Sequence, residues 1–590
     1  MIELISLVTI FWTPVVIVLL KKYLWDIYFW QLKEYRWDRF WTHIRWDHSE
    51  QNRSYTMITA KFILFSLVSL LFTEPILAAF GIVTSFVLFT FEAFDFVADV
   101  INKDVIKPSL KNIRNILIIL ILLALIILIP AIITTPFIAL LDLAEDGIST
   151  SNGIIANIYS SAETGVYPDV YVLFGLLTMF ALFLDLASPF IVPIGVILTW
   201  PLAYIKRALI IKKAEVKLRN RKNPLTIIGI TGSQGKSTTK EILYQILKKK
   251  YKAERTPENY NTDVGVALSI LSEIKEDTEI FIAEMGAYRL GEIGKMVSHF
   301  TPDIGIITDI DTQHLGLFGG YANLRIAKSE MVRFMKNDGL AILNGDSTHC
   351  RAVAEELNKQ TVLVSSEFSN RKVLELMENP KLKHIFADDI KETESKITFV
   401  LNDNDVSEKY SLKHAGKHLV NNILICVAAS NHLGMTYSEI SEVLNDIDLE
   451  LPRLTYETGD NNTVVLNDSY NSSYKGFVAA VEYMNHLKKN QKLKKRIVIT
   501  KGIYELGREK KAVYKNLVHE LKKHIDVLVT TDPLLAKLAR QDNLNVEIFN
   551  VKKYQDIIYY FREQVSEGDI VLLEGRLHPE VIKAIVSDKA

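Results

Sequence analysis

The sequence predicts a multidomain protein: an N-terminal α-helical transmembrane domain, then a central α/β domain with a P-loop and an α/β, Rossmann-like C-terminal domain. Three observations predict this organisation. Long apolar runs are confined to residues 1 to about 205, a glycine-rich loop follows a strand pattern near residue 231, and strand and helix patterns alternate from there onward. We expect the three domains at residues 1–215, 216–449 and 450–590.

Composition excludes several classes of protein. A chain of 590 residues is too long for one hydrophobic core. Its 68 Lys and Arg balance 69 Asp and Glu, which argues against a nucleic-acid partner bound through phosphate neutralisation. Cys350 and Cys426 are the only cysteines, so we expect neither a disulfide framework nor a thiolate metal site.

The N-terminal third contains four apolar runs, at residues 2–20, 57–101, 116–141 and 170–203. About 20 apolar residues cross a bilayer, so these runs predict five or six membrane elements. The last run is too long for one straight helix, and we expect a break at Asp185, Pro189 or Pro193. Buried soluble helices could explain one such run, but hardly four.

The loops between these runs predict the orientation. Loops 21–55 and 102–114 are rich in Lys and Arg, whereas loop 142–168 has neither and carries four acidic residues. Basic loops stay in the cytoplasm, which implies five crossings, an external N-terminus and a re-entrant or interfacial stretch within 185–205. We therefore expect a multi-pass protein of the cell membrane with its α/β domains in the cytoplasm. The aromatic and basic segment 23–46 either lies among the lipid headgroups or binds an anionic lipid substrate.

The glycine-rich loop is the strongest chemical signal in the chain. It follows the apolar run 225–230 and precedes a helical pattern over 238–247. Such a loop directs backbone N–H groups and the positive end of a helix at a phosphate. Lys236 can reach the terminal phosphates and the Ser237 hydroxyl can bind Mg²⁺, although Ile230 stands where the full motif has glycine. The residues expected to bind nucleotide here are Thr231, Gly232, Ser233, Gln234, Gly235, Lys236, Ser237 and Thr238.

Polar clusters follow the predicted strands of both α/β domains, where open α/β sheets bind ligands. A carboxylate after a strand is often only a helix cap, and a lone histidine is often structural, so no single cluster establishes a function. The clusters are Glu284-Met285-Gly286, Asp309 to His314, Lys328-Ser329-Glu330, Asn344-Gly345-Asp346 and Asp468-Ser469-Tyr470-Asn471.

In their order and spacing, these motifs resemble the Mur ligases, ATP-dependent amide-forming enzymes of peptidoglycan synthesis. The resemblance covers about residues 224–590. It also includes Glu258 to Gly265, Gly416-Lys417-His418 with Asn422, Arg453, and Glu505-Leu506-Gly507.

The resemblance implies that ATP and Mg²⁺ are used to phosphorylate a carboxylate, which an amine then attacks to form an amide. It implies that Lys236 holds the β- and γ-phosphates, and that Ser237 and Glu284 bind the first Mg²⁺. It further implies that His314 binds a second Mg²⁺ and that Lys328 is carbamylated to become a metal ligand, unless an unmodified Lys328 contacts phosphate.

The remaining residues carried over from the resemblance belong to the nucleotide site. Asn344 and Asn471 are expected beside adenine, Asp468 at the ribose, and Arg453 at an ATP phosphate. The expected partners are a muropeptide-like substrate, an amino acid or dipeptide, and membrane lipids.

Four places depart from the family pattern: Thr262, Asp309-Ile310-Asp311, Tyr474, and Glu574-Gly575-Arg576, which replaces a Lys-Gly-Ser near the acceptor side. A Glu in place of that Lys would repel a carboxylate unless Arg576 compensates. The family's N-terminal uridine-nucleotide domain has no room between the membrane domain and the P-loop, which suggests a lipid-linked substrate. A membrane anchor for an enzyme of the UDP-linked precursor, a capsule-type polyamide synthetase and a P-loop-driven transporter are the alternatives.

Overall fold

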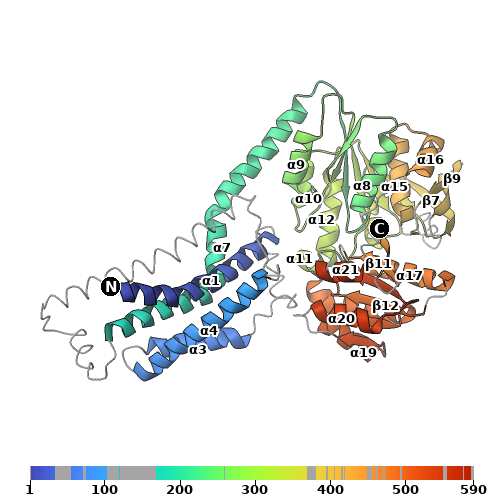
Figure 1. The fold of residues 1–590 in the computed structure, drawn as a ribbon. Helices are drawn as coiled ribbons and strands as arrows, with labels where there is room; N and C mark the ends of the chain where they lie inside the picture. The colour runs from blue at the N-terminus through green and yellow to red at the C-terminus, as the bar shows by residue number, and fades with distance from the viewer. Residues whose placement is uncertain are drawn as a thin grey trace. The chain divides into compact units, whose positions relative to one another are not determined.

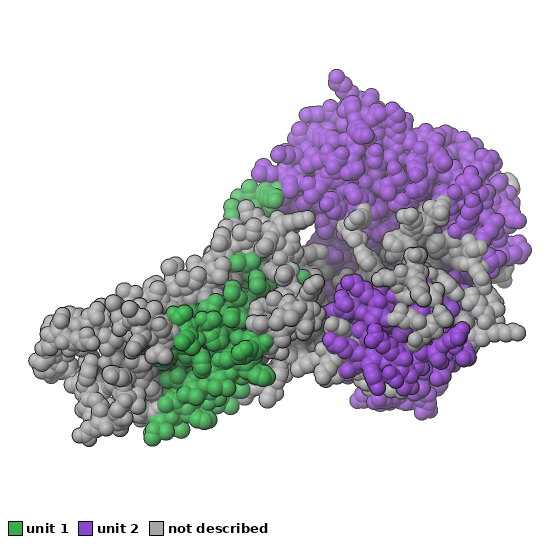
Figure 2. Space-filling model, in the orientation of Figure 1, with its two compact units in different colours: residues 1–40, 52–206 green, residues 41–51, 207–590 purple. Residues whose placement is uncertain are grey.

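The computed structural model describes residues 2–32, 55–70, 75–101, 119, 168–257, 260–367, 380–393, 396–403, 406–413, 416–417, 419–447, 455–459, 463–469, 472–491, 494–548, 554–575 and 577–586. By internal contacts the chain divides into two compact units (Figure 2). The first contains residues 1–40 and 52–206, and the second contains residues 41–51 and 207–590.

The first unit is built from apolar helices: α1 (Ile2–Leu32), α3 (Tyr55–Ser69), α4 (Pro75–Ile101) and most of α7 (Pro168–Arg219). Many large apolar side chains point outward, among them Ile76, which is 85% exposed. By length and composition alone, three described helices could cross a membrane, at Val8–Tyr28, Ile76–Phe94 and Ile191–Arg219. The predicted run at 116–141, except residue 119, lies outside the described residues, as does the predicted segment 23–46 beyond residue 32.

The break expected within the run 170–203 is wrong. Helix α7 continues without interruption from Pro168 to Arg219, so the boundary predicted at residue 215 falls inside it. In apolar surroundings a helix is the simplest way to satisfy backbone groups, which outweighs the bonds lost at proline. Asp185 does not end the helix either, because its carboxylate is neutralised by lysines from two other helices.

A cluster of four charged side chains lies between the helices of the first unit. The Asp185 carboxylate of α7 lies 2.8 Å from Lys22 Nζ of α1 and 3.1 Å from Lys61 Nζ of α3. Lys61 also pairs with Glu92 of α4 at 2.7 Å. Two cations and two anions therefore neutralise one another across four helices, which is how charges are tolerated in an apolar interior.

In the second unit, the first sheet contains nine strands in the order β2-β3-β1-β4-β5-β6-β7-β8-β9. Figure 1 shows this sheet with helices packed beside it. These are β1 (Thr226–Thr231), β2 (Ala253–Arg255), β3 (Ile280–Glu284), β4 (Ile304–Ile307), β5 (Leu340–Asn344), β6 (Gln360–Ser365), β7 (Leu382–Glu392), β8 (Ile397–Asp403) and β9 (Val406–Leu412). Strands β2 to β7 run parallel, as predicted, whereas β7, β8 and β9 pair antiparallel, which was not predicted.

Helices cover both faces of this sheet. Ile228 and Ile230 of β1 pack in a core with α8 (Lys236–Leu247), α15 (Leu419–His432) and α16 (Tyr437–Asp446). The opposite core, around Phe281 and Ala283 of β3, contains α9 (Asp263–Ser272), α10 (Glu292–His299), α12 (Tyr321–Phe334), α13 (Thr348–Glu355) and the end of α7. The continuous apolar runs that predicted these strands reflect burial on both faces.

The second sheet has six strands in the order β10-β11-β15-β12-β13-β14. These are β10 (Thr455–Thr458), β11 (Val464–Asp468), β12 (Arg496–Thr500), β13 (Val527–Thr530), β14 (Val546–Ile548) and β15 (Ile570–Glu574). Its helices are α17 (Tyr474–Gln491), α18 (Lys510–His524), α19 (Pro533–Gln541), α20 (Tyr554–Gln564) and α21 (Pro579–Ile585). Because β15 returns between β11 and β12, the carboxyl ends of these three strands meet, and such a topological switch point is where α/β sheets bind ligands.

Candidate active site

The glycine-rich loop has the geometry of a phosphate cradle. Strand β1 ends at Thr231 and helix α8 begins at Lys236. Gly232 and Gly235 have φ angles of 149° and 75°, and an added Cβ would lie 2.1 Å from Thr308 Oγ1 and 2.6 Å from Asn422 Oδ1, respectively. Side chains are therefore excluded at both positions, which lets an anion approach the backbone at the helix N-terminus closely.

Lys236 lies over this loop. Its ammonium donates hydrogen bonds to the carbonyl oxygens of Gly232 at 2.8 Å and Ser233 at 3.2 Å. A cation held at the open side of a backbone cradle suits the terminal phosphates of a nucleotide. Loop, helix end and lysine together fit a nucleoside triphosphate.

Glu284, the last residue of β3, forms a buried pair with a lysine that the sequence analysis missed. Glu284 Oε1 accepts a hydrogen bond from Asn261 Nδ2 at 3.1 Å, and Oε2 lies 3.3 Å from Lys240 Nζ. Both side chains of the ion pair are almost fully buried. Lys240 lies one helical turn after Lys236 on α8, so the two side chains share a face of the helix. That spacing was the sequence signal that could have placed Lys240 beside the phosphate loop.

The chemistry around Glu284 fits Mg²⁺. This ion is usually held by one or two carboxylates together with substrate phosphates and waters. Glu284 and the Ser237 hydroxyl of the first turn of α8 are oxygen ligands of that kind, and Glu284 Oε2 accepts no hydrogen bond from the described residues. Among the described residues, no group of three or more His, Cys, Asp or Glu is arranged to hold a metal ion.

His314 is oriented by a carboxylate from the second sheet. Its Nδ1 contacts the Glu505 carboxylate, and its ring packs edge-on against Tyr288 with centroids 4.6 Å apart. Both His314 and Glu505 have φ of 59°, which is uncommon for residues other than glycine and indicates a constrained junction. A carboxylate on one ring nitrogen fixes the imidazole for ligation through the other, a role for Glu505 that the sequence analysis did not assign.

Lys328 is a buried amine on α12. Burial lowers its pKa to about 7, and the positive charge of Lys236 acts in the same direction. The nearby Glu330 carboxylate is engaged elsewhere, since it accepts hydrogen bonds from Gly291 N at 2.6 Å and Gly294 N at 2.8 Å. At neutral pH a large fraction of Lys328 is therefore the uncharged, nucleophilic amine.

Of the residues predicted to bind adenosine, two are described. The Asn344 amide joins the ends of two strands, donating to Thr308 O at 3.0 Å and accepting from Asp346 N at 2.9 Å. Asp468 ends β11 and lies beside Glu574 of β15 in the sheet register. Arg453 and Asn471 lie outside the described residues.

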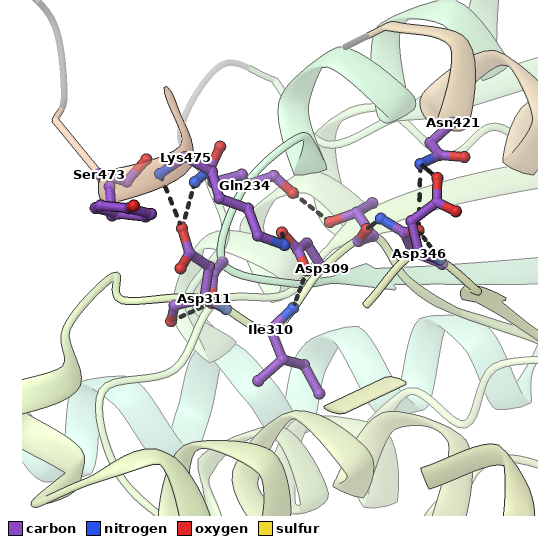
Figure 3. A network of polar contacts seen from close by, with 12 residues as sticks. Gln234, Asp309, Ile310, Asp311, Asp346, Asn421, Ser473 and Lys475 are labelled. Carbon is purple, nitrogen blue, oxygen red and sulfur yellow. Dashed lines mark hydrogen bonds and ion pairs between the residues drawn. The ribbon is translucent and has the colours of Figure 1, made fainter. Parts of the chain in front are cut away.

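A polar network links the P-loop to the start of α17 (Figure 3). Lys475 Nζ lies 2.8 Å from the Asp309 carboxylate, and the Lys475 backbone N–H lies 3.3 Å from Asp311 Oδ2. Asp311 also accepts a hydrogen bond from Gln234 Nε2 at 2.7 Å. Burial raises the pKa of Asp311, and the negative charge of Asp309 adds to the shift. The departures from the family pattern at 309–311 and at 474 thus lie next to each other, where Asp309 and Asp311 contact Lys475. Lys475 was not predicted from the sequence.

Comparison with protein families identifies both parts of the second unit. Residues 230–430 match the Mur ligase middle domain, and residues 453–577 match the Mur ligase glutamate ligase domain. One relative is the UDP-N-acetylmuramoyl-tripeptide–D-alanyl-D-alanine ligase of Bacillus subtilis, 26% identical over 367 residues, which are 61% of this chain and 76% of that one. The ligase of the same name from Borreliella burgdorferi is 27% identical over 353 residues, which are 59% and 71% of the two chains.

Solved structures agree on the fold. MurF from Acinetobacter baumannii superposes with a TM-score of 0.54 at 24% identity, covering 63% of this chain and 78% of that one. MurF ligase from Thermotoga maritima in complex with ADP gives a TM-score of 0.52 at 23% identity, covering 63% and 80%. With its middle and C-terminal domains, the chain belongs to the Mur ligase family, whose members are ADP-forming acid–amino-acid ligases that use ATP and Mg²⁺.

Proposed function

We propose that the protein is a membrane-bound ligase of peptidoglycan precursor synthesis that joins an amino acid or dipeptide to the peptide of a muropeptide. The observation that carries this proposal is the meeting of the P-loop, the Glu284–Lys240 pair and the buried amine Lys328 in one Mur ligase middle domain. The relatives named above are ligases of D-alanyl-D-alanine and a UDP-linked muramoyl tripeptide.

The reaction brings negatively charged groups together. A carboxylate oxygen of the muropeptide attacks the γ-phosphorus of ATP, ADP leaves, and the amine then attacks the acyl carbon and releases phosphate. Lys236 and the helix N-terminus would offset the negative charge of the phosphates, and a bound Mg²⁺ would supply further positive charge there. Ser237 and Glu284 would hold that ion.

Lys328 and His314 would serve a second metal. A neutral Lys328 amine can add CO₂ and lose a proton, which turns a neutral amine into an anionic oxygen ligand. The lowered pKa of Lys328 and the orientation of His314 by Glu505 support this assignment. Arg453 at a phosphate, Asp468 at the ribose and Asn344 or Asn471 at adenine complete the proposed nucleotide site.

The first unit would hold the protein, and a lipid-linked donor, at the membrane. Three helices of sufficient length and apolar character support a membrane location, and the basic loops support catalytic domains in the cytoplasm. A lipid-linked muropeptide would take the place of the uridine nucleotide, because the family models match only the middle and C-terminal domains of this chain.

The test uses the full-length protein in lipid nanodiscs with Mg²⁺ and ATP. Lipid-linked and UDP-linked muramoyl tripeptides are compared as donors, with D-alanyl-D-alanine and single amino acids as acceptors, and the amide is detected by mass spectrometry. The proposal expects ADP and amide in equal amounts, a higher kcat/KM for the lipid-linked donor, and loss of both products in Lys236→Ala. Preference for the UDP-linked donor would leave the first unit as an anchor only. ADP release without any amide would support the polyamide or transporter functions instead.

A further inference from the structure

Glu574 is a buried carboxylate that has no ion-pair partner among the described residues. It ends β15, is 0% exposed, and neither of its oxygens accepts a hydrogen bond or an ion pair from any residue that the structure describes. The Ser472 hydroxyl lies beside it and acts to lower its pKa. A buried carboxyl group whose oxygens accept so few hydrogen bonds is costly and rarely occurs without a function.

Glu574 lies where ligands bind in this type of sheet. Its Cα pairs in parallel register with Asp468 of β11 and with Thr500 of β12, so three neighbouring strand ends meet at the topological switch point. Gly575 follows with φ of 77°, and an added Cβ there would lie 3.3 Å from Gly502 O. The turn after Glu574 is therefore tight and leaves the carboxylate at the carboxyl edge of the sheet.

Two acidic residues lie side by side at this edge. Residues in register on neighbouring strands project to the same face, which places the Asp468 and Glu574 carboxylates together. Burial, and then the negative charge of Asp468, raise the pKa of Glu574 well above its usual range. Both effects favour the neutral carboxyl group of Glu574, whereas a cation beside it would favour the ionised form.

We infer that Glu574 determines acceptor specificity by binding an ammonium or guanidinium group at the non-reacting end of the incoming amine. This inference rests on the proposed ligase function. If the acceptor carried a carboxylate at its far end, that group would be a third acid beside Asp468 and Glu574. A cationic group there would instead donate hydrogen bonds to the oxygens of Glu574. The amine that reacts is thus part of a molecule with a second cationic group rather than a free carboxylate at its far end.

The test compares three acceptors of equal length in the full-length enzyme: D-alanyl-D-alanine, its C-terminal amide, and the analogue in which CH₂NH₃⁺ replaces the terminal carboxylate. The expected kcat/KM falls from the ammonium to the amide to the carboxylate acceptor. In Glu574→Gln the preference for ammonium over amide should fall on the order of 10- to 100-fold. Glu574→Lys should instead favour the carboxylate acceptor.

Asp532→Asn is the matched control. Asp532 follows β13 at the same edge of the sheet, but its carboxylate is already paired with Lys510 at 2.8 Å and Tyr514 OH at 2.9 Å. Acceptor preference should not change in this variant. A second measurement is calorimetry in buffers of different ionisation enthalpy: the ammonium acceptor should release up to one proton on binding to the native protein and none on binding to Glu574→Gln.

Hydroxylamine separates this inference from the proposed function, because it traps an acyl phosphate as a hydroxamate without an acceptor site. No hydroxamate with either muropeptide donor would contradict the ligase function itself. Hydroxamate together with a preference for the carboxylate acceptor would overturn the role of Glu574 alone. A changed KM for ATP with unchanged acceptor preference in Glu574→Gln would also overturn it, by placing Glu574 on the nucleotide side.

Discussion

Two carboxylates of similar burial, one in each unit, differ in what surrounds them. Asp185 in the helical unit is 1% exposed and is paired with Lys22 and Lys61. Glu574 in the α/β unit is 0% exposed and has no such partner among the described residues. A paired buried charge is retained for structure, because losing one partner leaves the others unsatisfied, whereas an unpaired one has a use only when a ligand arrives.

The Glu284–Lys240 pair is an intermediate case. Both side chains are buried and lie 3.3 Å apart, yet Glu284 is also the carboxylate that fits Mg²⁺. Its lysine would then keep the carboxylate satisfied until the metal and nucleotide bind. The three carboxylates thus form a series. Asp185 has permanent lysine partners, Glu284 has a lysine that a metal would replace, and Glu574 has no cationic partner among the described residues.

The largest effect is expected for Asp185→Asn. Removing the shared carboxylate takes a paired acid from Lys61, which is buried, and from Lys22, which is partly buried, and should lower the free energy of unfolding of the helical unit by about 3–5 kcal/mol. Thermal unfolding in nanodiscs measures it. The control Glu92→Gln removes a more exposed acid that pairs with one lysine, and should cost less. Equal stability of native and Asp185→Asn protein would show that the cluster is not structural.

Lys240→Met should leave Glu284 with the Asn261 hydrogen bond but without its lysine partner at 3.3 Å. We expect a loss of about 2 kcal/mol in stability without nucleotide, since a buried charge loses a directly paired cation. Mg²⁺ with a non-hydrolysable ATP analogue should restore more stability to the variant than it adds to the native protein. Thermal shift with and without the analogue measures the difference, and equal shifts would disconnect Lys240 from the metal site.

Glu574→Gln should increase the stability of the protein, in contrast to Lys240→Met, and the increase should depend on pH. A carboxyl group whose pKa is raised by folding stabilises the protein below its unfolded pKa, and that contribution disappears as pH rises through the folded pKa. The native protein and the variant should therefore be similar near pH 4. By pH 8 the variant should be more stable by about 1 kcal/mol. Urea unfolding at a series of pH values measures this, and a difference that shrinks as pH rises would contradict the unpaired state.

The smallest effect is expected for Lys475→Met. The side chain of Lys475 is about half exposed, so loss of its ion pair with buried Asp309 should cost only about 0.5–1 kcal/mol. Because the pair joins the P-loop region to α17, the KM for ATP should rise more than kcat falls. Lys391→Met, which breaks an exposed pair with Asp389, controls for loss of a surface lysine and should change neither.

The same contrast explains what could be predicted from sequence. Buried parallel strands such as β1 and β3 were predictable because both of their faces are apolar, and the P-loop because its function depends on local residues. Strand β8 alternates between buried and partly exposed residues and pairs antiparallel within a charged segment, so it lacked that signal. Pairs such as Lys22–Asp185 and Asp309–Lys475 join residues more than 160 positions apart, and no local pattern indicates them.

Departures from the family pattern could be seen in the sequence, but their structural surroundings could not. Glu574 could be recognised as a reversal of charge, while its burial and missing partner depend on how β15 inserts between β11 and β12. Likewise, Glu505 became a partner of His314 only through the junction of the two sheets.

The transfer of oxygen from donor to phosphate tests the central claim most directly. The full-length protein in nanodiscs would receive a muropeptide labelled with ¹⁸O in the carboxylate that reacts, together with ATP, Mg²⁺ and the acceptor amine. An acyl phosphate pathway predicts one ¹⁸O in each phosphate released, in step with amide formation and absent in Lys236→Ala. Unlabelled phosphate, released at the same rate without donor or amine, would show that the P-loop hydrolyses ATP for another purpose and would contradict the ligase account.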